Sequence, residues 1–382
     1  MNALKQLETC GQSPWLDYLK RSLIHNGELE RLIERDGVKG VTSNPSIFEQ
    51  AIGHSDEYAD AIQQFLGEGA PAAAEIYEHL AIADIRAAAD VLRPVHVRTR
   101  GRDGYVSLEC SPYLANDTEA TVAEALRLWE AVARSNLMVK VPATPAGLPA
   151  VRRLIAGGLN INVTLLFSVE AYEQAVEAYI AGLEALLDAG GDVSSIASVA
   201  SFFVSRIDTA VDKRLDGLAD GQAADRLRGK AAIANAKMAY DRYKALFSGS
   251  RWQKLASAGA QTQRLLWAST GAKNPAYKDT IYVESLIGAD TVNTMPPATM
   301  DAFRDHGKIE PGAIEQDLAD AKTTLSELTE RGVSLDEITR QLVEDGVRQF
   351  SEAFDKLFAS LEKRRRILLD GQRPGLRIQT NR

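Results

Sequence analysis

Cysteine and histidine are scarce in this chain of 382 residues, which has only two cysteines and five histidines. Cys10 and Cys110 are too few for a disulfide framework or a cysteine-based zinc site. The histidines show no paired ligand spacing, so we expect neither a zinc-dependent aldolase nor a zinc hydrolase. The glycine-rich nucleotide-binding motifs and the G-x-S-x-G serine motif are also missing. We therefore expect no metal and no other cofactor.

An excess of positive charge and a long hydrophobic run are likewise lacking. The chain has 44 Lys plus Arg against 52 Asp plus Glu, which argues against nucleic-acid or membrane-surface partners. Its longest uncharged run, at 154–169, is interrupted by Gly-Gly and two Asn and is shorter than the ~20 residues that span a bilayer. The N-terminus lacks the basic and apolar regions of a secretory signal, so we expect a cytoplasmic protein.

What the sequence does contain is a regular alternation of short apolar runs with stretches of helical periodicity, typical of βα units around a parallel sheet. Eight runs predict strands near residues 15–19, 38–44, 105–111, 137–141, 161–167, 196–203, 265–269 and 291–295. Eight is the number that closes a (β/α)8 TIM barrel. We expect one barrel over residues 1–297 with a helical insertion at about 55–90, and a helical C-terminal extension over 298–382 packed on it.

Helix signals fill the intervals between the predicted strands. Asp117 precedes an apolar stripe that predicts a buried helix face, formed by Val122, Leu126, Trp129 and Ala133. A second stripe has the same spacing and consists of Tyr172, Val176, Tyr179 and Leu183. Ser334 and Glu337 have capping-box spacing and predict the start of a long amphipathic helix that ends near residues 370–371.

Polar residues occupy inward positions of several predicted strands, because strand side chains alternate between the helices and the barrel axis. They are Asp17, Asn44, Glu109, Lys140, Asn162 and Thr164. Burying each of them separately would cost several kcal/mol per uncompensated charge, roughly speaking. The pattern therefore predicts one shared polar network at the carboxyl ends of the strands, where barrel active sites lie.

Lys140 is the most distinctive residue of this set, because it lies between two valines in a strand. Burial favours a neutral amine, and a neutral amine can attack a carbonyl carbon to form a Schiff base. The alternatives are a structural ion pair with Glu109 or Asp17 that merely fills the barrel, and a position exposed to solvent. Lys39, the other strand lysine, has the opposite parity and is expected outside the barrel or at its bottom.

Two segments suit phosphate binding. Ser201 and Arg206 end the sixth predicted strand, and Ser269, Gly271 and Lys273 follow the seventh. Small residues that open a loop beside a cation can hold a phosphate, and barrel enzymes commonly use the late loops for this purpose. Taken singly, Gly271 could be a simple turn residue and Arg206 a helix-start residue facing solvent.

Six segments together resemble the signature segments of the transaldolase family, over about residues 16–296. They are GVTSNPSIF, SLECSP, LMVKVPAT, INVTLLFS, ASFFVSR and LLWASTGAKNP. The resemblance implies a metal-free class I aldolase barrel of the pentose phosphate pathway. Such an enzyme moves a dihydroxyacetone unit reversibly from sedoheptulose 7-phosphate to glyceraldehyde 3-phosphate, giving erythrose 4-phosphate and fructose 6-phosphate.

The resemblance also implies a role for each site residue. Lys140 would form the Schiff base, and Asp17 would take the proton of the C4 hydroxyl as the C3–C4 bond breaks. Glu109 and Thr164 would hold a catalytic water and move protons. The substrate-binding set implied by the family is Asn44, Asn162, Ser201, Arg206, Ser269 and Lys273.

The chain departs from the family pattern near the expected phosphate. An arginine is common two residues after the equivalent of Ser269, where this chain has Gly271, so the charge is assigned to Lys273. Phe202 and Ser205 replace a common Pro and Gly. Two alternatives stay open, a fructose-6-phosphate-type aldolase and a non-catalytic sugar-phosphate-binding barrel. The sequence leaves the choice between monomer and homodimer open.

Overall fold

The computed structural model describes residues 2–53, 55–67, 69, 71–218 and 225–372, with side chains as far as 369. Eight parallel strands in chain order form a closed barrel. They are β1 Gln12–Asp17, β2 Gly40–Thr42, β3 Tyr105–Glu109, β4 Leu137–Pro142, β5 Ile161–Leu166, β6 Ser198–Phe203, β7 Arg264–Ala268 and β8 Thr291–Met295. This confirms the predicted (β/α)8 barrel, with strand bounds that differ from the expected ones by a few residues.

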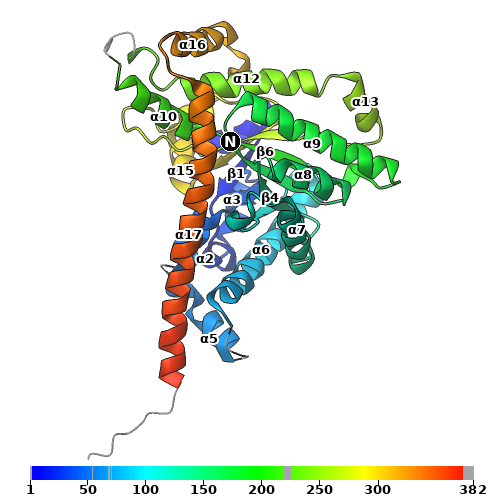
Figure 1. Ribbon diagram of the computed structural model, residues 1–382, viewed down its shortest axis with the longest axis vertical. Helices are drawn as coiled ribbons and strands as arrows, with labels where there is room; N and C mark the ends of the chain where they lie inside the picture. The colour runs from blue at the N-terminus through cyan, green and yellow to red at the C-terminus, as the bar shows by residue number, and fades with distance from the viewer. Residues whose placement is uncertain (1, 54, 68, 70, 219–224, 373–382) are drawn as a thin grey trace, which may run out of the picture.

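Helices surround this barrel (Figure 1). The α-helices between β1 and β4 are α2 Arg21–His25, α3 Glu28–Asp36, α4 Pro45–Phe48, α5 Ala59–Gly67, α6 Ala73–Arg98 and α7 Thr118–Val132. Those between β4 and β8 are α8 Gly147–Ala156, α9 Val169–Asp188, α10 Ser205–Leu215, α12 Ala231–Leu246, α13 Ser250–Ser257 and α14 Ile281–Glu284. Before β1 comes α1 Ala3–Gln6, and after β8 come α15 Pro297–His306, α16 Leu318–Glu330 and α17 Leu335–Gln372.

Short helical turns complete the element order. They are η1 Leu7–Cys10, η2 Glu49–Gly53, η3 Asp56–Tyr58, η4 Pro112–Leu114, η5 Val193–Ser195 and η6 Ala313–Glu315. Of these, η2 is a π-helix and the others are 3-10 helices. Within the described part of the chain, no helix combines the length and apolar character needed to cross a membrane.

The two predicted helix stripes have different outcomes. In α9, the predicted stripe is fully buried as expected. In α7, Asp117 caps the helix by accepting a hydrogen bond from the Ala120 backbone nitrogen at 3.0 Å, but the predicted stripe is wrong. Leu126 is 41% exposed, and the buried face instead consists of Thr121, Ala125, Leu128 and Val132. Small residues on that face let α7 pack closely against its neighbours, which a search for large apolar residues overlooks.

The long helix α17 lies at the carboxyl end of the barrel. It begins after Ser334, whose hydroxyl accepts a hydrogen bond from the Glu337 backbone nitrogen as the capping spacing predicted. It contacts β5 and four segments that follow strands, namely α4, η2, η4 and α10. Further along, it reaches α5 of the predicted insertion (Figure 1). The predicted extension runs on to residue 382, and its last ten residues lie outside the described part.

The opposite end of the barrel is closed by a buried polar cluster that the sequence did not predict. Arg264, at the start of β7, forms an ion pair of 2.8 Å with Asp103, and both side chains are less than 5% exposed. Asp103 also accepts hydrogen bonds from the Ser13 hydroxyl at 2.8 Å and from the Trp15 indole at 3.1 Å. This cluster ties β1, β7 and the loop before β3 together, away from the carboxyl ends of the strands.

Candidate active site

A cavity of about 170 Å³ opens at the carboxyl ends of the strands. Eight of the ten predicted site residues line it: Asp17, Asn44, Lys140, Thr164, Ser201, Arg206, Ser269 and Lys273. The other two, Glu109 and Asn162, contact members of this set. The structure therefore brings the ten predicted residues together at one end of the barrel, although they come from five strands and from the segments that follow β2, β6 and β7.

Lys140 lies within this group as a buried amine with two polar neighbours. Its Nζ is 3.4 Å from Glu109 Oε2 and donates a hydrogen bond to the Ser43 carbonyl oxygen at 3.1 Å. Glu109 and Lys140 are paired neighbours on β3 and β4, and their side chains are only 6% and 5% exposed, respectively. The ion pair considered as a structural alternative is thus present. Lys140 also lines the cavity, so it is not enclosed entirely by the barrel interior.

The two carboxyl groups of the site both have their pKa values raised by burial. For Glu109, burial outweighs the opposing charges of Lys140 and Arg206, so its pKa lies above the ordinary glutamate value. For Asp17, burial likewise raises the pKa, against a hydrogen bond of 2.7 Å from the Thr42 hydroxyl and the charge of Lys140. Both carboxyls can therefore exchange protons closer to neutral pH than exposed ones.

Asn162 is the centre of a hydrogen-bonded chain next to Lys140. Its Nδ2 donates to the Ser107 hydroxyl at 3.0 Å, and its Oδ1 accepts from the Ser201 hydroxyl at 2.6 Å. Both ends of this buried amide are thus fixed. Asn44 caps α4, because its Oδ1 accepts a hydrogen bond from the Ile47 backbone nitrogen at 3.0 Å.

The Thr164 hydroxyl differs from these groups because it is buried and has no hydrogen-bond partner within the protein. Buried polar atoms are nearly always paired, so an unpaired one that lines a cavity indicates a position for a water or substrate atom. This fits the water-holding role that the family resemblance assigns to Thr164.

The cationic side of the cavity comes from the loops after β6 and β7. The Arg206 guanidinium lies 5.1 Å from the centre of the Phe203 ring. Burial lowers the pKa of Arg206, whereas the charges of Glu109, Asp17 and Asp345 raise it. Lys273 is exposed at the cavity rim.

Ser269 and Gly271 shape the loop after β7 that carries Lys273. Ser269 has a left-handed backbone with φ of 56°, and its hydroxyl lies 2.9 Å from that of Ser205. At Gly271, an added Cβ would lie 3.1 Å from Thr299 Oγ1, so a larger residue here would require Thr299 to shift by a few tenths of an ångström.

Several lining residues were not assigned from the sequence. Strand parity could have found Thr42 and Thr294, whose hydroxyls lie 2.7 Å apart in the cavity wall. Phe350 could not have been found in this way. It belongs to α17, more than fifty residues after the last strand, and reaches the cavity only through tertiary packing.

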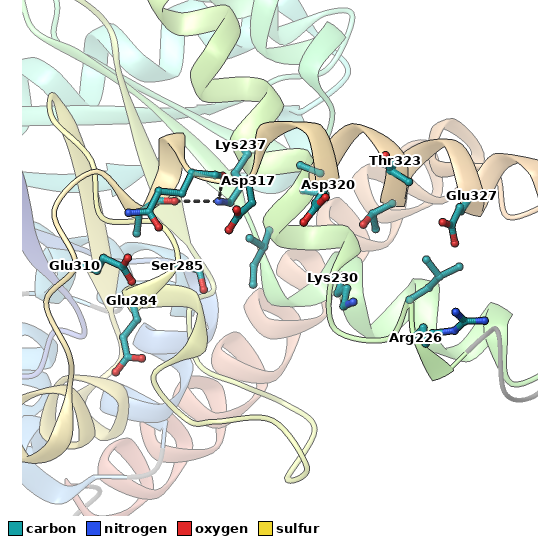
Figure 2. Close-up of a pocket in the computed structure, with 17 residues that line it drawn as sticks. Arg226, Lys230, Lys237, Glu284, Ser285, Glu310, Asp317, Asp320, Thr323 and Glu327 are labelled. Atoms are coloured by element: carbon teal, nitrogen blue, oxygen red, sulfur yellow. Dashed lines mark hydrogen bonds between the residues drawn. The ribbon is translucent and has the colours of Figure 1, made fainter.

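A larger groove of about 580 Å³ lies outside the barrel between α12 and α16, and Figure 2 shows its lining. Its cations are interleaved with carboxylates such as Asp317 and Asp320, and none of the ten predicted site residues lies there. Lys237, the most buried cation of this groove, donates hydrogen bonds to the Ala313 and Gln316 carbonyl oxygens. These contacts join α12 to the segment before α16, which is a structural role.

Comparison with known proteins agrees with this geometry. A family model described as "Transaldolase/Fructose-6-phosphate aldolase" matches residues 14–361. A protein named "Transaldolase" from Trichodesmium erythraeum is 45% identical, with 95% of this chain and 97% of the relative covered. "Transaldolase 1" from Streptomyces coelicolor is 48% identical, with 94% of each chain covered. A "Transaldolase" from Thiobacillus denitrificans is 47% identical over 94% of this chain and 100% of its own length. The chain belongs to the transaldolase/fructose-6-phosphate aldolase family.

Proposed function

We propose that this protein is a transaldolase. It would transfer a dihydroxyacetone unit reversibly from sedoheptulose 7-phosphate to glyceraldehyde 3-phosphate through a Schiff base on Lys140. The observation that carries the proposal is the buried Lys140 amine, which lies 3.4 Å from Glu109 and lines the same cavity as Arg206 and Lys273. The proposed nucleophile, its proton carrier and the cations that would bind phosphate thus lie together at one end of the barrel.

The first half of the reaction needs a neutral amine and the removal of one water. The Lys140 nitrogen adds to the C2 carbonyl carbon of the ketose, and the carbinolamine then loses its hydroxyl as water to give an iminium ion. Glu109, whose pKa burial raises, is placed beside this nitrogen to accept and return the protons of these steps. The unpaired Thr164 hydroxyl would hold the water that carries them.

The second half breaks and remakes a carbon–carbon bond. Asp17 takes the proton of the C4 hydroxyl, the C3–C4 electron pair moves toward the iminium nitrogen, and the aldose product leaves. The enamine that stays on Lys140 then attacks the aldehyde carbon of the acceptor, and Asp17 returns the proton to the new hydroxyl. Hydrolysis of the new iminium frees the amine.

The remaining predicted residues would bind the two ends of the substrate. Asn44, Asn162 and Ser201 offer amide and hydroxyl groups to the dihydroxyacetone hydroxyls. Arg206, Ser269 and Lys273 would hold the phosphate, and their positions at the late strands suit this role.

The family name also covers aldolases that release dihydroxyacetone without an acceptor. Phe350 favours the transferase, because this apolar ring of α17 lines the cavity and limits the access of water to an enamine held there. Free dihydroxyacetone formed from fructose 6-phosphate alone, at the rate of transfer, would favour the aldolase. Absence of turnover with either substrate pair would favour a non-catalytic sugar-phosphate-binding barrel.

Borohydride trapping tests the proposal directly. Incubation with fructose 6-phosphate and sodium borohydride should add a reduced three-carbon unit to the peptide containing Lys140, and Lys140→Ala should abolish it. Lys39→Ala is the matched control, because Lys39 also adjoins a strand but pairs with Glu8 in η1, before β1. An adduct on another lysine, or none in the wild type, would refute the proposed function.

The partners, the pathway and the cellular location of the protein belong to the same proposal. Sugar phosphates would be the partners, the pentose phosphate pathway the context and the cytoplasm the location. Metal independence, the absence of a cofactor and a state of monomer or homodimer stay predictions from the sequence. The division into a barrel over 1–297, with its insertion at about 55–90, and an extension over 298–382 is also proposed.

A further inference from the structure

We infer that the close approach of Gly346 of α17 to the Leu165 side chain helps to keep Leu165 in an unusual backbone conformation and so positions the Thr164 hydroxyl. The inference rests on the proposed function, because it concerns how Thr164 reaches its place beside Lys140. Gly346 and Leu165 are positioning residues, since neither lines the cavity.

The strand that carries Thr164 is irregular at this point. Val163 pairs with Ala200 and Leu166 with Phe202, so Thr164 and Leu165 together oppose the single residue between them on β6. This is a β-bulge, which re-aims side chains and is common near active sites. Leu165 adopts a φ of 59°, a left-handed conformation that residues with a branched side chain rarely occupy. The surrounding structure must hold it there.

The helix α17 supplies that support. An ideal Cβ built on Gly346 would lie 2.8 Å from Leu165 Cδ2 and 3.4 Å from Cδ1, so any larger residue here would require the end of the Leu165 side chain to shift. Glycine is unfavourable inside a helix, and Gly346 lies well within the 38 residues of α17. The close contact with Leu165 offers a structural explanation for a glycine at this helix position.

Thr164 is also held by Ala143, the residue that follows β4. Its carbonyl oxygen accepts a hydrogen bond from the Ala143 backbone nitrogen at 2.8 Å. The bulge and this bond together determine where the Thr164 hydroxyl points, and that hydroxyl has no partner within the protein to orient it. Any shift of Leu165 therefore passes to Thr164, the adjacent residue.

Gly346→Ala tests the inference, because the added methyl group must displace the end of the buried Leu165 side chain. We expect kcat to fall roughly 10- to 100-fold with KM changed less than about threefold, which is the effect of a misplaced catalytic group. Borohydride trapping at Lys140 should slow by the same factor. Leu165→Ala removes the atoms that Gly346 contacts and should also lower kcat. This second variant tests the inference if Gly346→Ala does not fold.

A double-variant cycle separates positioning from simple destabilisation. If Gly346 acts through Thr164, then Gly346→Ala should have little further effect on kcat in a Thr164→Ala background. Leu361→Ala is the matched control, because it removes a buried side chain of α17 about four turns from Gly346. It should lower Tm and leave kcat per folded molecule unchanged.

The outcomes are distinct. Independent effects of Gly346→Ala and Thr164→Ala, or a lower Tm for Gly346→Ala with an unchanged kcat, would overturn the positioning role. Absence of a Lys140 adduct in the wild type would instead refute the proposed function.

Discussion

The Lys140 side-chain nitrogen lies 3.4 Å from the Glu109 carboxylate, with the two residues aligned across β4 and β3. This distance is long for a charge-assisted hydrogen bond, and Glu109 Oε2 has no hydrogen-bond partner. The two groups therefore form a loose ion pair, and the proposed Schiff-base chemistry would pass protons through Glu109.

Glu109→Gln should remove one of these proton transfers while keeping the shape of the side chain. We expect kcat to fall by about 100-fold, within the range for loss of a general acid–base group. Burial raises the pKa of Glu109, so its carboxylate takes up a proton at a pH above the ordinary glutamate pKa. As the pH falls, the wild type should therefore begin to lose activity before the ordinary glutamate pKa is reached. A pH profile of kcat should show this acid limb in the wild type, and the contribution of Glu109 to it should be missing from the Glu109→Gln variant.

The control for this variant is Glu8→Gln, which removes the partner of Lys39 outside the cavity. Its pH profile should match the wild type. Equal effects of the two substitutions would mean that Glu109 serves stability alone.

The two cations of the cavity should differ in their contribution to phosphate binding. Arg206 is partly buried against Phe203, whereas Lys273 is exposed to solvent that screens its charge. Arg206→Gln should therefore raise KM for fructose 6-phosphate more than about tenfold, and Lys273→Gln by a smaller factor that shrinks further in high salt. Steady-state kinetics at two ionic strengths measures both, and unchanged KM values would place the phosphate elsewhere.

Much of this architecture could be predicted because it depends on local patterns. Alternation along β3, β4 and β5 distinguishes inward Glu109, Lys140 and Thr164 from their apolar neighbours, and eight such strands have one common closed arrangement. Barrel closure then brings the strand ends together without further information.

The features that were missed depend on contacts between distant segments. The sequence of β5 alternates regularly, so it gives no sign of the bulge at Leu165. No local pattern indicates the contact between α17 and Leu165 either. From the sequence, Phe350 is one of several apolar residues of an amphipathic helix. Only the contacts of α17 with the barrel show that it lines the cavity. The predicted buried face of α7 was wrong for a related reason. In the packed structure the small Ala125 is buried, whereas the larger Leu126 is exposed.

Asp208 of α10 should make stability depend on pH. Burial raises the pKa of Asp208 to about 6, although it accepts hydrogen bonds from the Ala232 backbone nitrogen and the Tyr282 hydroxyl. Between the unfolded value of 3.8 and about 6, the folded protein holds a proton that the unfolded chain has lost. The stability from this group is therefore present below pH 3.8 and is lost as pH rises through 6.

Asp208→Asn should remove this pH dependence, because an amide stays neutral. The difference in unfolding free energy between variant and wild type should change by up to about 3 kcal/mol from about pH 4 to about pH 7, in favour of the variant at the higher pH. Urea unfolding across this range measures it. A constant difference would mean that Asp208 titrates normally in the folded protein.

The buried cluster at the other end of the barrel should affect stability without affecting catalysis. Asp103→Asn leaves the Arg264 guanidinium, only 4% exposed, without its counter-charge, and such a loss costs about 3–5 kcal/mol. Because the cluster lies at the amino ends of β1 and β7, kcat per folded molecule should stay unchanged. Asp103→Asn combined with Arg264→Met should unfold at a higher urea concentration than Asp103→Asn alone, since the unpaired charge is then gone. A lower kcat in Asp103→Asn at full folding would show instead that the two ends of the barrel are coupled.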